Sequence, residues 1–438
     1  MPATFNLSDY RSSILFAGGL VLAAGLAMSL DGGLRLLALS GATKVDYASE
    51  GLFTPAAPRA LSDAERERAV VAWAYIEQNT RAETGWVDSV AGFPSTTLWD
   101  QGSYLLGLVA ARQLGLVEDG DFDDRVRRML DSFARLPLHD DKLPNKVYDT
   151  RTLAMVDYAN RPAPEGVGWS ALDIARMLTA FRVLERHMPQ YGGEIRDVLS
   201  TWDLASMAQN GELYGAERAD GETRLVQEGR MGYEQYAARA AAMWGLDVVQ
   251  AISAERVLDW HTVSGVDVPV DLREHTAFQA ITPTLSEPYL LQAFEFGLDS
   301  EALRLAGRVY AAQEQRYRST GLLTAVSEDH IDRAPHFLYS SVFANGKAWN
   351  VVAEDGEAHT DLRTLSLKAS IGWDALFDTA YSEALVTAVD PLADPERGWP
   401  AGIYEADGAV NDVYTLNTNA IVLEALHFTA RGPLWNVR

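Results

Sequence analysis

Apolar and polar residues recur along most of this chain with the period of an α-helix. Val70, Trp73 and Ala74 fall on one helical face, and Ser62 precedes Glu65 at the spacing of a capping box. Strictly alternating runs, which would predict half-buried strands, are rare. The pattern therefore predicts an all-α class for the main part of the chain.

A second pattern is an internal repeat, in which an aromatic and a polar residue lead into a helix rich in Ala, Leu and Gly. Between the copies lie amphipathic helices whose charged residues fall mostly on one face. A helix that is apolar nearly all round must be buried, whereas a helix with a charged stripe faces water on that side. The copies begin at Leu98, Gly168, Met231, Leu285, Ile371 and Tyr414.

Six buried helices surrounded by about six amphipathic ones make an (α/α)6 toroid, in which each hairpin buries its inner face against its neighbours. We expect this toroid over residues 61–438. An open α-solenoid is the alternative, although the short, uniform repeats of that class are absent from the sequence.

An uncharged stretch over residues 12–30 lies between Arg11 and Asp31. A helix of that length just reaches across a bilayer core of roughly 30 Å. We expect residues 1–31 to be an uncleaved signal anchor, or a signal peptide cleaved near residues 38–42, with a buried core helix as the alternative. Either targeting segment would place the toroid in the periplasm behind a linker over residues 32–60. The anchor would hold it at the inner membrane.

Charge and composition limit the partners. A formal net charge of -24 and a pI of about 4.7 disfavour nucleic acids and acidic polysaccharides, so a neutral partner fits better. The absence of Cys excludes disulfides, zinc-thiolate sites and thiol nucleophiles. His330 and His336 lack metal-ligand spacing, and no nucleotide-binding fingerprint occurs. We expect neither a metal nor a cofactor.

The buried helices are predicted to run in the same direction, so the residues that open them should gather at one mouth of the toroid. Aromatic rings beside carboxylates suit a sugar chain, because pyranose CH groups stack on ring faces and hydroxyls need directional acceptors. Each polar residue could instead only cap its helix. The residues expected at the mouth are Trp99, Asp100, Trp169, Asp173, Tyr233, Glu234, Glu287, Trp373, Asp374, Asn417 and Asn419.

Three long connections, over residues 144–169, 316–342 and 398–420, are expected to overhang this mouth. Long connections in a compact domain are often functional. Together with the helix starts they provide the predicted sugar contacts, which are Trp99, Tyr148, Trp169, Asp173, Tyr233, Trp399, Tyr404, Asn417 and Asn419.

Cleavage of a glycosidic bond needs two carboxyl groups, one protonated to assist the leaving group and one ionised to activate water or attack directly. We expect Glu234 to be the general acid, because the tyrosines of its GYEQYAA segment offer a partly apolar setting that raises a carboxyl pKa. Asp157 or Asp100 is the predicted base, and Glu328 is a substitute for either role. The alternative is that these groups are ordinary solvated carboxylates.

Several segments resemble, in order, the bacterial family catalogued as domain of unknown function 3131. The resemblance covers almost everything from about Ser62 onward. It implies a six-hairpin glycosidase-like fold, related to glycoamylase-like proteins and to (α/α)6 enzymes acting on β-1,2-glucans. The segments are LWDQGSYLLGLVAARQLGLV, LPNKVYDTRT, VDYANRP, GWSALDIARML, GYEQYAARAAAMWG, SEPYLLQAFEFG, TAVSEDHIDRAPHFLYSSV and NTNAIVLEAL.

The resemblance also implies that Asp173, in SALDIARML, sits in the sugar cleft. The glycoamylase-like segment has a Glu shortly before this Asp, whereas here residues 168–170 occupy that approach and the nearest acid is Glu165. This departure leaves the identity of the general acid open.

We therefore expect a glycoside hydrolase or transglycosylase that acts on a neutral β-glucan or exopolysaccharide in the periplasm. One alternative is a non-catalytic polysaccharide-binding subunit of an export or synthesis complex. A polysaccharide lyase is another, but lyases act on anionic uronates, which the negative charge disfavours.

Overall fold

The computed structural model of the protein describes residues 53–273 and 280–436. The expected targeting segment over residues 1–31 and most of the expected linker lie outside the described residues. Within the described ranges, no helix is both long enough and apolar enough to cross a membrane.

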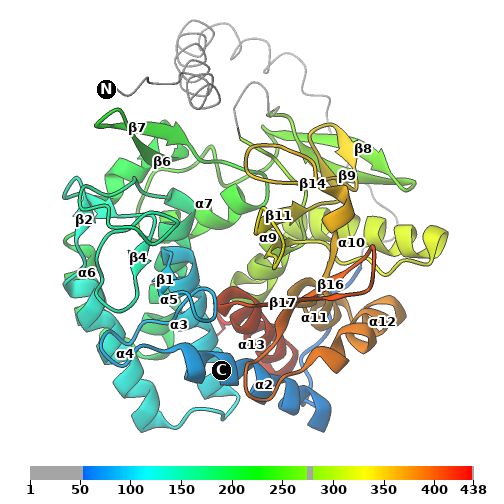
Figure 1. Cartoon of the computed structure of the whole chain (residues 1–438), viewed down its shortest axis with the longest axis horizontal. Coiled ribbons are helices and arrows are strands. Elements are labelled where there is room, and N and C mark those ends of the chain that lie inside the picture. The colour runs from blue at the N-terminus through cyan, green and yellow to red at the C-terminus, as the bar shows by residue number, and fades with distance from the viewer. Residues whose placement is uncertain (1–52, 274–279, 437–438) are drawn as a thin grey trace, which may run out of the picture. The chain divides into compact units, whose positions relative to one another are not determined.

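A closed inner ring of six helices forms the centre of the described chain (Figure 1). Each inner helix packs against the next, and the last one, α13, packs against the first one, α3. This closure gives the predicted six-hairpin arrangement and excludes the open solenoid. The inner helices are α3 (Leu98–Gln113), α5 (Ala171–His187), α7 (Tyr233–Met243), α9 (Glu287–Leu291) with a π-helical turn (Gln292–Phe296), α11 (Leu367–Phe377) and α13 (Leu416–Arg431).

Two glycines of α3 allow the inner helices to approach closely. A side chain at Gly102 would meet backbone atoms of Arg176 and Met177 in α5 at 3.1 Å. A side chain at Gly107 would meet the Ala420 side chain of α13 at 3.2 Å. Both contacts are tighter than a close-packed interior accepts, so the lack of a Cβ at these positions sets the spacing of the ring.

An outer layer of amphipathic helices covers this ring. The predicted capping box begins the first of them, since the Glu65 N–H donates to Ser62 Oγ at 3.2 Å and the Ser62 N–H donates to Glu65 Oε2 at 2.7 Å. The outer helices are α2 (Asp63–Asn79), α4 (Asp119–Ala134), α6 (Gly192–Leu199), α10 (Ser300–Thr320) and α12 (Ala380–Val389).

The sixth outer position is different. Between α7 and α9 the described chain forms an antiparallel hairpin of β8 (Leu258–Val263) and β9 (Val266–Asp271), and β9 packs against α10.

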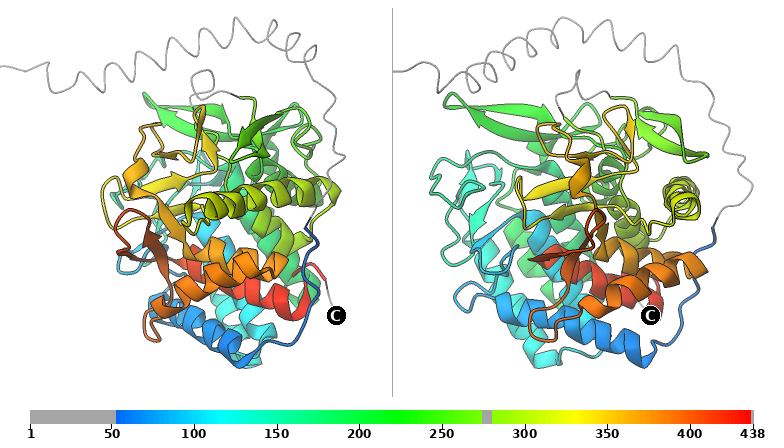
Figure 2. Two further views of the ribbon diagram at one scale, coloured as in Figure 1. Left: turned by 90° about the vertical axis from the view of Figure 1, so that its right-hand side faces the viewer. Right: turned by 45° about the vertical axis from the view of Figure 1, so that its right-hand side comes forward.

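The connections contain small antiparallel sheets, so the predicted all-α class is correct only for the two helical layers. Most of these strands have two to five residues, too few for alternation to appear in the sequence. In side view, β10, β11, β16 and β17 lie on one side of the helices (Figure 2, left). Three of the sheets have three strands each. The first consists of β5 (Ala208–Gln209), β6 (Glu212–Ala219) and β7 (Glu222–Gln227), and the second of β10 (Glu328–His330), β11 (Phe337–Ser340) and β14 (Val351–Val352). The third consists of β15 (Thr364–Ser366), β16 (Pro400–Tyr404) and β17 (Val410–Tyr414).

Two-stranded ladders tie the remaining connections together. They pair β1 (Ser95–Thr96) with β4 (Tyr148–Asp149), β2 (Leu138–His139) with β3 (Leu143–Pro144), and β12 (Phe343–Ala344) with β13 (Lys347–Ala348).

The end of the expected linker belongs to the helical unit. The Ala56 N–H donates to the Leu376 carbonyl at 2.7 Å, and the Arg59 N–H donates to the Thr429 carbonyl at 2.8 Å. The Phe53 ring also packs edge-on against an aromatic ring of α10. Residues 53–60 are therefore attached to the ends of α11 and α13.

Candidate active site

Side chains from the first turns of the inner helices meet at one mouth of the ring. Asn417 of α13 accepts a hydrogen bond from Ser103 of α3 at 3.0 Å and donates one to Glu287 of α9 at 3.0 Å. The Trp99 ring of α3 lies 5.4 Å, edge to face, from the Tyr233 ring of α7. The predicted convergence of helix starts is therefore present.

A buried ion network forms the floor of this mouth. The Lys368 ammonium, in the first turn of α11, lies 2.5 Å from Glu287 Oε2 and 3.4 Å from Asp329 Oδ1. All three side chains are almost fully buried. Because these two carboxylates already compensate a buried cation, we assign them a structural role.

Glu328 lies beside this network on β10, paired with Tyr339 of β11. Burial raises the pKa of the Glu328 carboxyl to about 8, and the negative charge of Glu287 adds to the rise, while Lys368 opposes it. Glu328 as a whole residue is half-buried. A carboxyl group in this setting keeps its proton at neutral pH.

A second carboxyl group of raised pKa opens α5. Ser170, the N-cap, donates to Asp173 Oδ1 at 2.9 Å and accepts from the Asp173 N–H at 3.1 Å. Burial raises the pKa of Asp173 to about 7, and the nearby carboxylates of Glu228 and Asp100 add to the rise. Asp173 is half-buried in the first turn of α5.

Glu228 holds the start of α5 in place. Its Oε2 accepts hydrogen bonds from the N–H groups of Ala171 and Leu172, which is the interaction expected of a carboxylate at a helix N-terminus. Of the charges that act on Asp173, that of the Glu228 carboxylate raises its pKa most.

The pKa of the Tyr339 hydroxyl is affected by both titratable groups. Burial raises the pKa of Tyr339, and the charges of Glu328 and Asp173 both add to the rise, so the hydroxyl is within electrostatic reach of both carboxyl groups. The Tyr233 hydroxyl lies beside the Glu328 carboxyl group and interacts with it. Two carboxyl groups and two phenols thus share one end of the ring.

Glu234, the predicted general acid, is engaged elsewhere. Its side chain is 3% exposed, and its carboxylate binds the Arg273 guanidinium at 2.8 Å. Arg273 also binds Asp271 at 2.7 Å. Burial raises the pKa of Glu234, but Arg273 opposes the rise. An arginine thus replaces the apolar setting expected from the sequence, and the geometry supports a structural role.

Asp157, a predicted base, organises a turn. Its carboxylate accepts from the N–H groups of Ala159 and Arg161 at 3.0 and 2.9 Å, and it pairs with the Arg161 guanidinium at 2.6 Å. The Arg161 guanidinium holds the pKa of Asp157 below its usual range. These contacts support a structural role for Asp157 too.

Asp100, the other predicted base, does lie at the mouth. Ser89 Oγ and Thr97 Oγ1 donate to it at 2.5 and 3.0 Å, and burial raises its pKa. Its charge also acts on Asp173. Asp100 is therefore a neighbour of Asp173.

Several predicted sugar contacts are buried in the protein instead. Tyr148, Trp169, Trp399 and Tyr404 each direct their polar atom to a partner within the chain, with donor to acceptor distances of 2.6 to 3.2 Å. Asn419 is fully buried and bonds to the Trp399 backbone. None of these five side chains can stack on or bind a sugar at the mouth without rearrangement.

Two residues expected at the mouth lie deeper in the ring. Helix α11 begins at Leu367 and not near Ile371, so Trp373 and Asp374 fall in its second turn. Trp373 stacks on Phe377 with ring centroids 5.6 Å apart, and Asp374 accepts from Ser382 of α12 at 2.9 Å. The remaining predicted contacts, Trp99, Asp173, Tyr233 and Asn417, do lie at the mouth.

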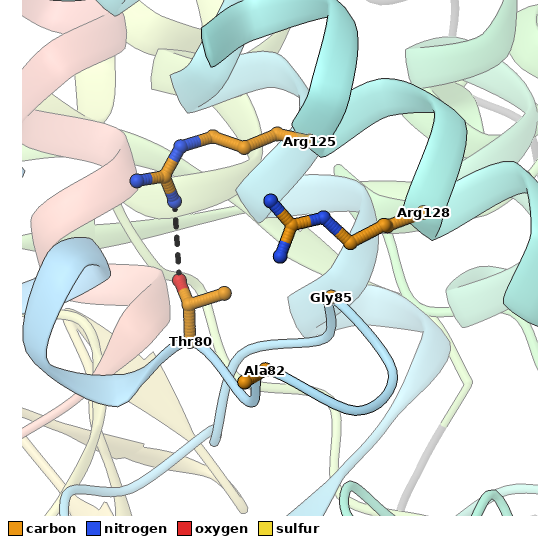
Figure 3. Close-up of a pocket in the computed structure, with 5 residues that line it drawn as sticks. All are labelled: Thr80, Ala82, Gly85, Arg125 and Arg128. Carbon is orange, nitrogen blue, oxygen red and sulfur yellow. Dashed lines mark hydrogen bonds between the residues drawn. The ribbon is translucent and has the colours of Figure 1, made fainter.

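A cavity of about 160 Å³ lies elsewhere, between the end of α2 and helix α4 (Figure 3). Its lining contains two arginines and no carboxylate, so it lacks an acid and base pair. The lining residues are Thr80, Ala82, Gly85, Arg125 and Arg128. Within residues 53–273 and 280–436, no group of three or more His, Asp or Glu side chains is placed to hold a metal ion.

The fold is shared with solved structures of carbohydrate-related proteins. A candidate glucoamylase from Bacteroides fragilis matches 87% of this chain and 95% of its own, at 11% identity and a TM-score of 0.65. An endo-β-1,2-glucanase from Chitinophaga pinensis, in complex with sophorotriose and glucose, matches 86% and 94%, at 12% identity and a TM-score of 0.62. At these identities the likeness establishes a common fold.

A fungal structure extends the comparison. An endo-β-1,2-glucanase from Talaromyces funiculosus, in complex with sophorose, matches 83% of this chain and 84% of its own, at 12% identity and a TM-score of 0.55. Among curated proteins, no sequence matches the chain. The family model described as "Protein of unknown function (DUF3131)" matches residues 67–432, and the chain therefore belongs to the DUF3131 family.

Proposed function

We propose that this protein is a glycoside hydrolase acting on a neutral β-glucan, with Glu328 as general acid and Asp173 as general base. The observation that carries the proposal is the pair of half-buried carboxyl groups, with pKa values of about 8 and about 7, within reach of one tyrosine hydroxyl. Perturbed carboxyl groups that share a mouth are the pattern expected of acid and base catalysis.

We assign the acid role to Glu328 and the base role to Asp173. At a pH between the two values, Glu328 is protonated and can give its proton to the glycosidic oxygen, while Asp173 is ionised. Asp173 then activates water or attacks the anomeric carbon directly. With the roles reversed, both groups would be mostly in the wrong protonation state at the same pH.

The charge of the mouth favours a neutral substrate. Asp100, Asp173 and Glu228 lie close together, and the whole chain carries a formal net charge of -24, so a uronate chain would be repelled. Sugar hydroxyls are donors that such carboxylates can accept from. Because the similar structures from Chitinophaga pinensis and Talaromyces funiculosus hold β-1,2-linked gluco-oligosaccharides, we propose β-1,2-glucan as the substrate class.

The test is a screen of the purified chain against β-1,2-glucan, other neutral β-glucans and an anionic polysaccharide, with products separated by chromatography. We expect shortened oligosaccharides from a neutral β-glucan, and longer products if a second sugar replaces water as acceptor. Binding of glucan without any product would contradict the proposal and favour a non-catalytic binding protein. An unsaturated product that absorbs in the ultraviolet would indicate a lyase.

We also propose that residues 12–30 hold the protein at the inner membrane, with the ring in the periplasm. The uncharged stretch between Arg11 and Asp31 supports this placement. Fractionation of cells that express the full chain should recover it in the membrane fraction, accessible to protease added to the periplasm. A shortened periplasmic form would indicate cleavage of a signal peptide, and protection from that protease would contradict the periplasmic placement.

A further inference from the structure

Tyr158 is an unusual aromatic residue in this chain. Its side chain is 65% exposed, and Phe93 is the only other exposed aromatic residue in the part of the chain that the structure describes. A tyrosine combines an apolar ring face with a polar hydroxyl, so an exposed ring beside a site is suited to contact a ligand.

A rigid turn presents this ring. The Asn160 N–H donates to the Asp157 carbonyl at 2.8 Å, which closes a β-turn with Tyr158 at its second position. The Asp157 carboxylate accepts from the Ala159 and Arg161 N–H groups, as in an Asx-turn. Asn160 also donates to Asp149 of β4 at 3.3 Å. The turn is thus fixed at both of its ends.

The turn lies at the mouth, because Asp149, which Asn160 binds, pairs with Ser95 of β1 just before α3 begins. The charged groups that act on the Tyr158 hydroxyl come from both sides of the mouth. Asp173 and Glu228 are on the side of α5, and Tyr339 and Glu354 are on the side of β11. Although solvent reaches most of the ring, the surrounding protein and these charges raise the pKa of its hydroxyl. The ring is therefore exposed at the mouth and close to the acid and base pair.

We infer that Tyr158 is a stacking platform for one pyranose ring of the substrate, in a subsite adjacent to Asp173. The CH face of a neutral sugar would lie on the aromatic face, and its hydroxyls would donate to the nearby Glu228 and Glu354 carboxylates. This inference rests on the proposed function and adds to it a residue that fixes the position of the glucan. Because the turn is already ordered, stacking requires little further ordering of the loop.

Isothermal titration with sophorotriose tests this inference in the Glu328→Gln background, where hydrolysis is blocked. We expect Tyr158→Ala to weaken binding about tenfold, and Tyr158→Phe to restore most of the affinity because it keeps the ring. Val70→Ala, at an exposed apolar position on the outer helix α2, is the matched control and should bind as the parent does.

Equal binding by the parent and Tyr158→Ala would overturn the platform. If the wild-type chain still hydrolysed β-1,2-glucan, that result would leave the proposed function in place. No binding of sophorotriose by the parent, together with no hydrolysis by the wild type, would overturn both.

Discussion

Glu328 lies directly opposite Tyr339 in the ladder between β10 and β11. The pairing places a carboxyl group of raised pKa beside the Tyr339 phenol. The charge of Asp173 also raises the pKa of this phenol. The pairing brings a strand that follows α10 and a helix start from the second hairpin into one site. The predictions below follow from this relationship and from the contacts around it.

The first prediction is a bell-shaped pH dependence. Activity should rise as Asp173 loses its proton near pH 7 and fall as Glu328 loses its proton near pH 8, with a maximum between these values. The measurement is kcat/KM on β-1,2-glucan from pH 5 to about 10. A maximum near pH 5, as expected for carboxyl groups of ordinary pKa, would be inconsistent with this site.

Two substitutions should move opposite limbs of that profile. Glu287→Gln removes a negative charge near Glu328, so the Glu328 pKa falls and the basic limb moves to lower pH. Glu228→Gln removes the charge that acts most strongly on Asp173, so its pKa falls and the acidic limb moves to lower pH.

The charged and titratable groups around Glu328 come from several elements. They are Glu287 of α9, Lys368 of α11, Tyr233 of α7, Tyr339 of β11 and Arg230 before α7. Glu287 acts on Glu328, whereas Glu228 acts on Asp173. Movement of the same limb in both variants would contradict the assignment of acid and base.

The third prediction separates the two roles considered for Asp157. Asp157→Asn keeps an oxygen that can accept from the Ala159 and Arg161 N–H groups, so activity should stay within a few-fold of wild type. Asp157→Ala loses the turn and should raise KM with little change in kcat. A fall of about 10²–10⁴-fold in kcat for Asp157→Asn would instead identify Asp157 as the base.

The fourth prediction concerns the centre of the ring. Arg176, with no exposed surface, binds Glu295 at 2.7 Å and Glu424 at 3.1 Å, and both glutamates are also fully buried. Removal of the cation in Arg176→Met leaves two buried carboxyl groups, so we expect a loss of about 3–5 kcal/mol in unfolding free energy. Chemical denaturation measures this loss.

Glu424→Gln is the matched variant at the same centre. Burial and the charge of Glu295 raise the pKa of Glu424, so its neutral form is favoured and a neutral amide is the closest replacement. The substitution should therefore cost about 1 kcal/mol or less. A loss as large as that of Arg176→Met would mean that both glutamates are ionised.

The sequence predicted the ring and part of its mouth for a clear physical reason. Helical period and burial pattern are local properties, and an N-cap such as Ser170 fixes where a helix begins and so where Asp173 projects. Where the start was placed four residues late, as in α11, Trp373 was assigned to the mouth and Lys368 was missed. A lone lysine in an otherwise apolar helix was the available signal.

The roles of individual carboxylates could not be predicted, because they depend on partners far away in the chain. Arg273 is 39 positions after Glu234 and binds it through the connection that follows β9. Glu228 meets the start of α5 from 57 positions away. Likewise, an aromatic residue in a loop gives no local signal of whether it is buried, as Trp399 is, or exposed, as Tyr158 is.

The central claim is tested most directly by hydrolysis of β-1,2-glucan with two folded glutamate variants, Glu328→Gln and Glu234→Gln. We predict that Glu328→Gln lowers kcat by about 10²–10⁴-fold, because it removes the transferable proton, whereas Glu234→Gln stays within about tenfold of wild type. Full activity in Glu328→Gln, or the large loss in Glu234→Gln alone, would contradict the site described for this protein.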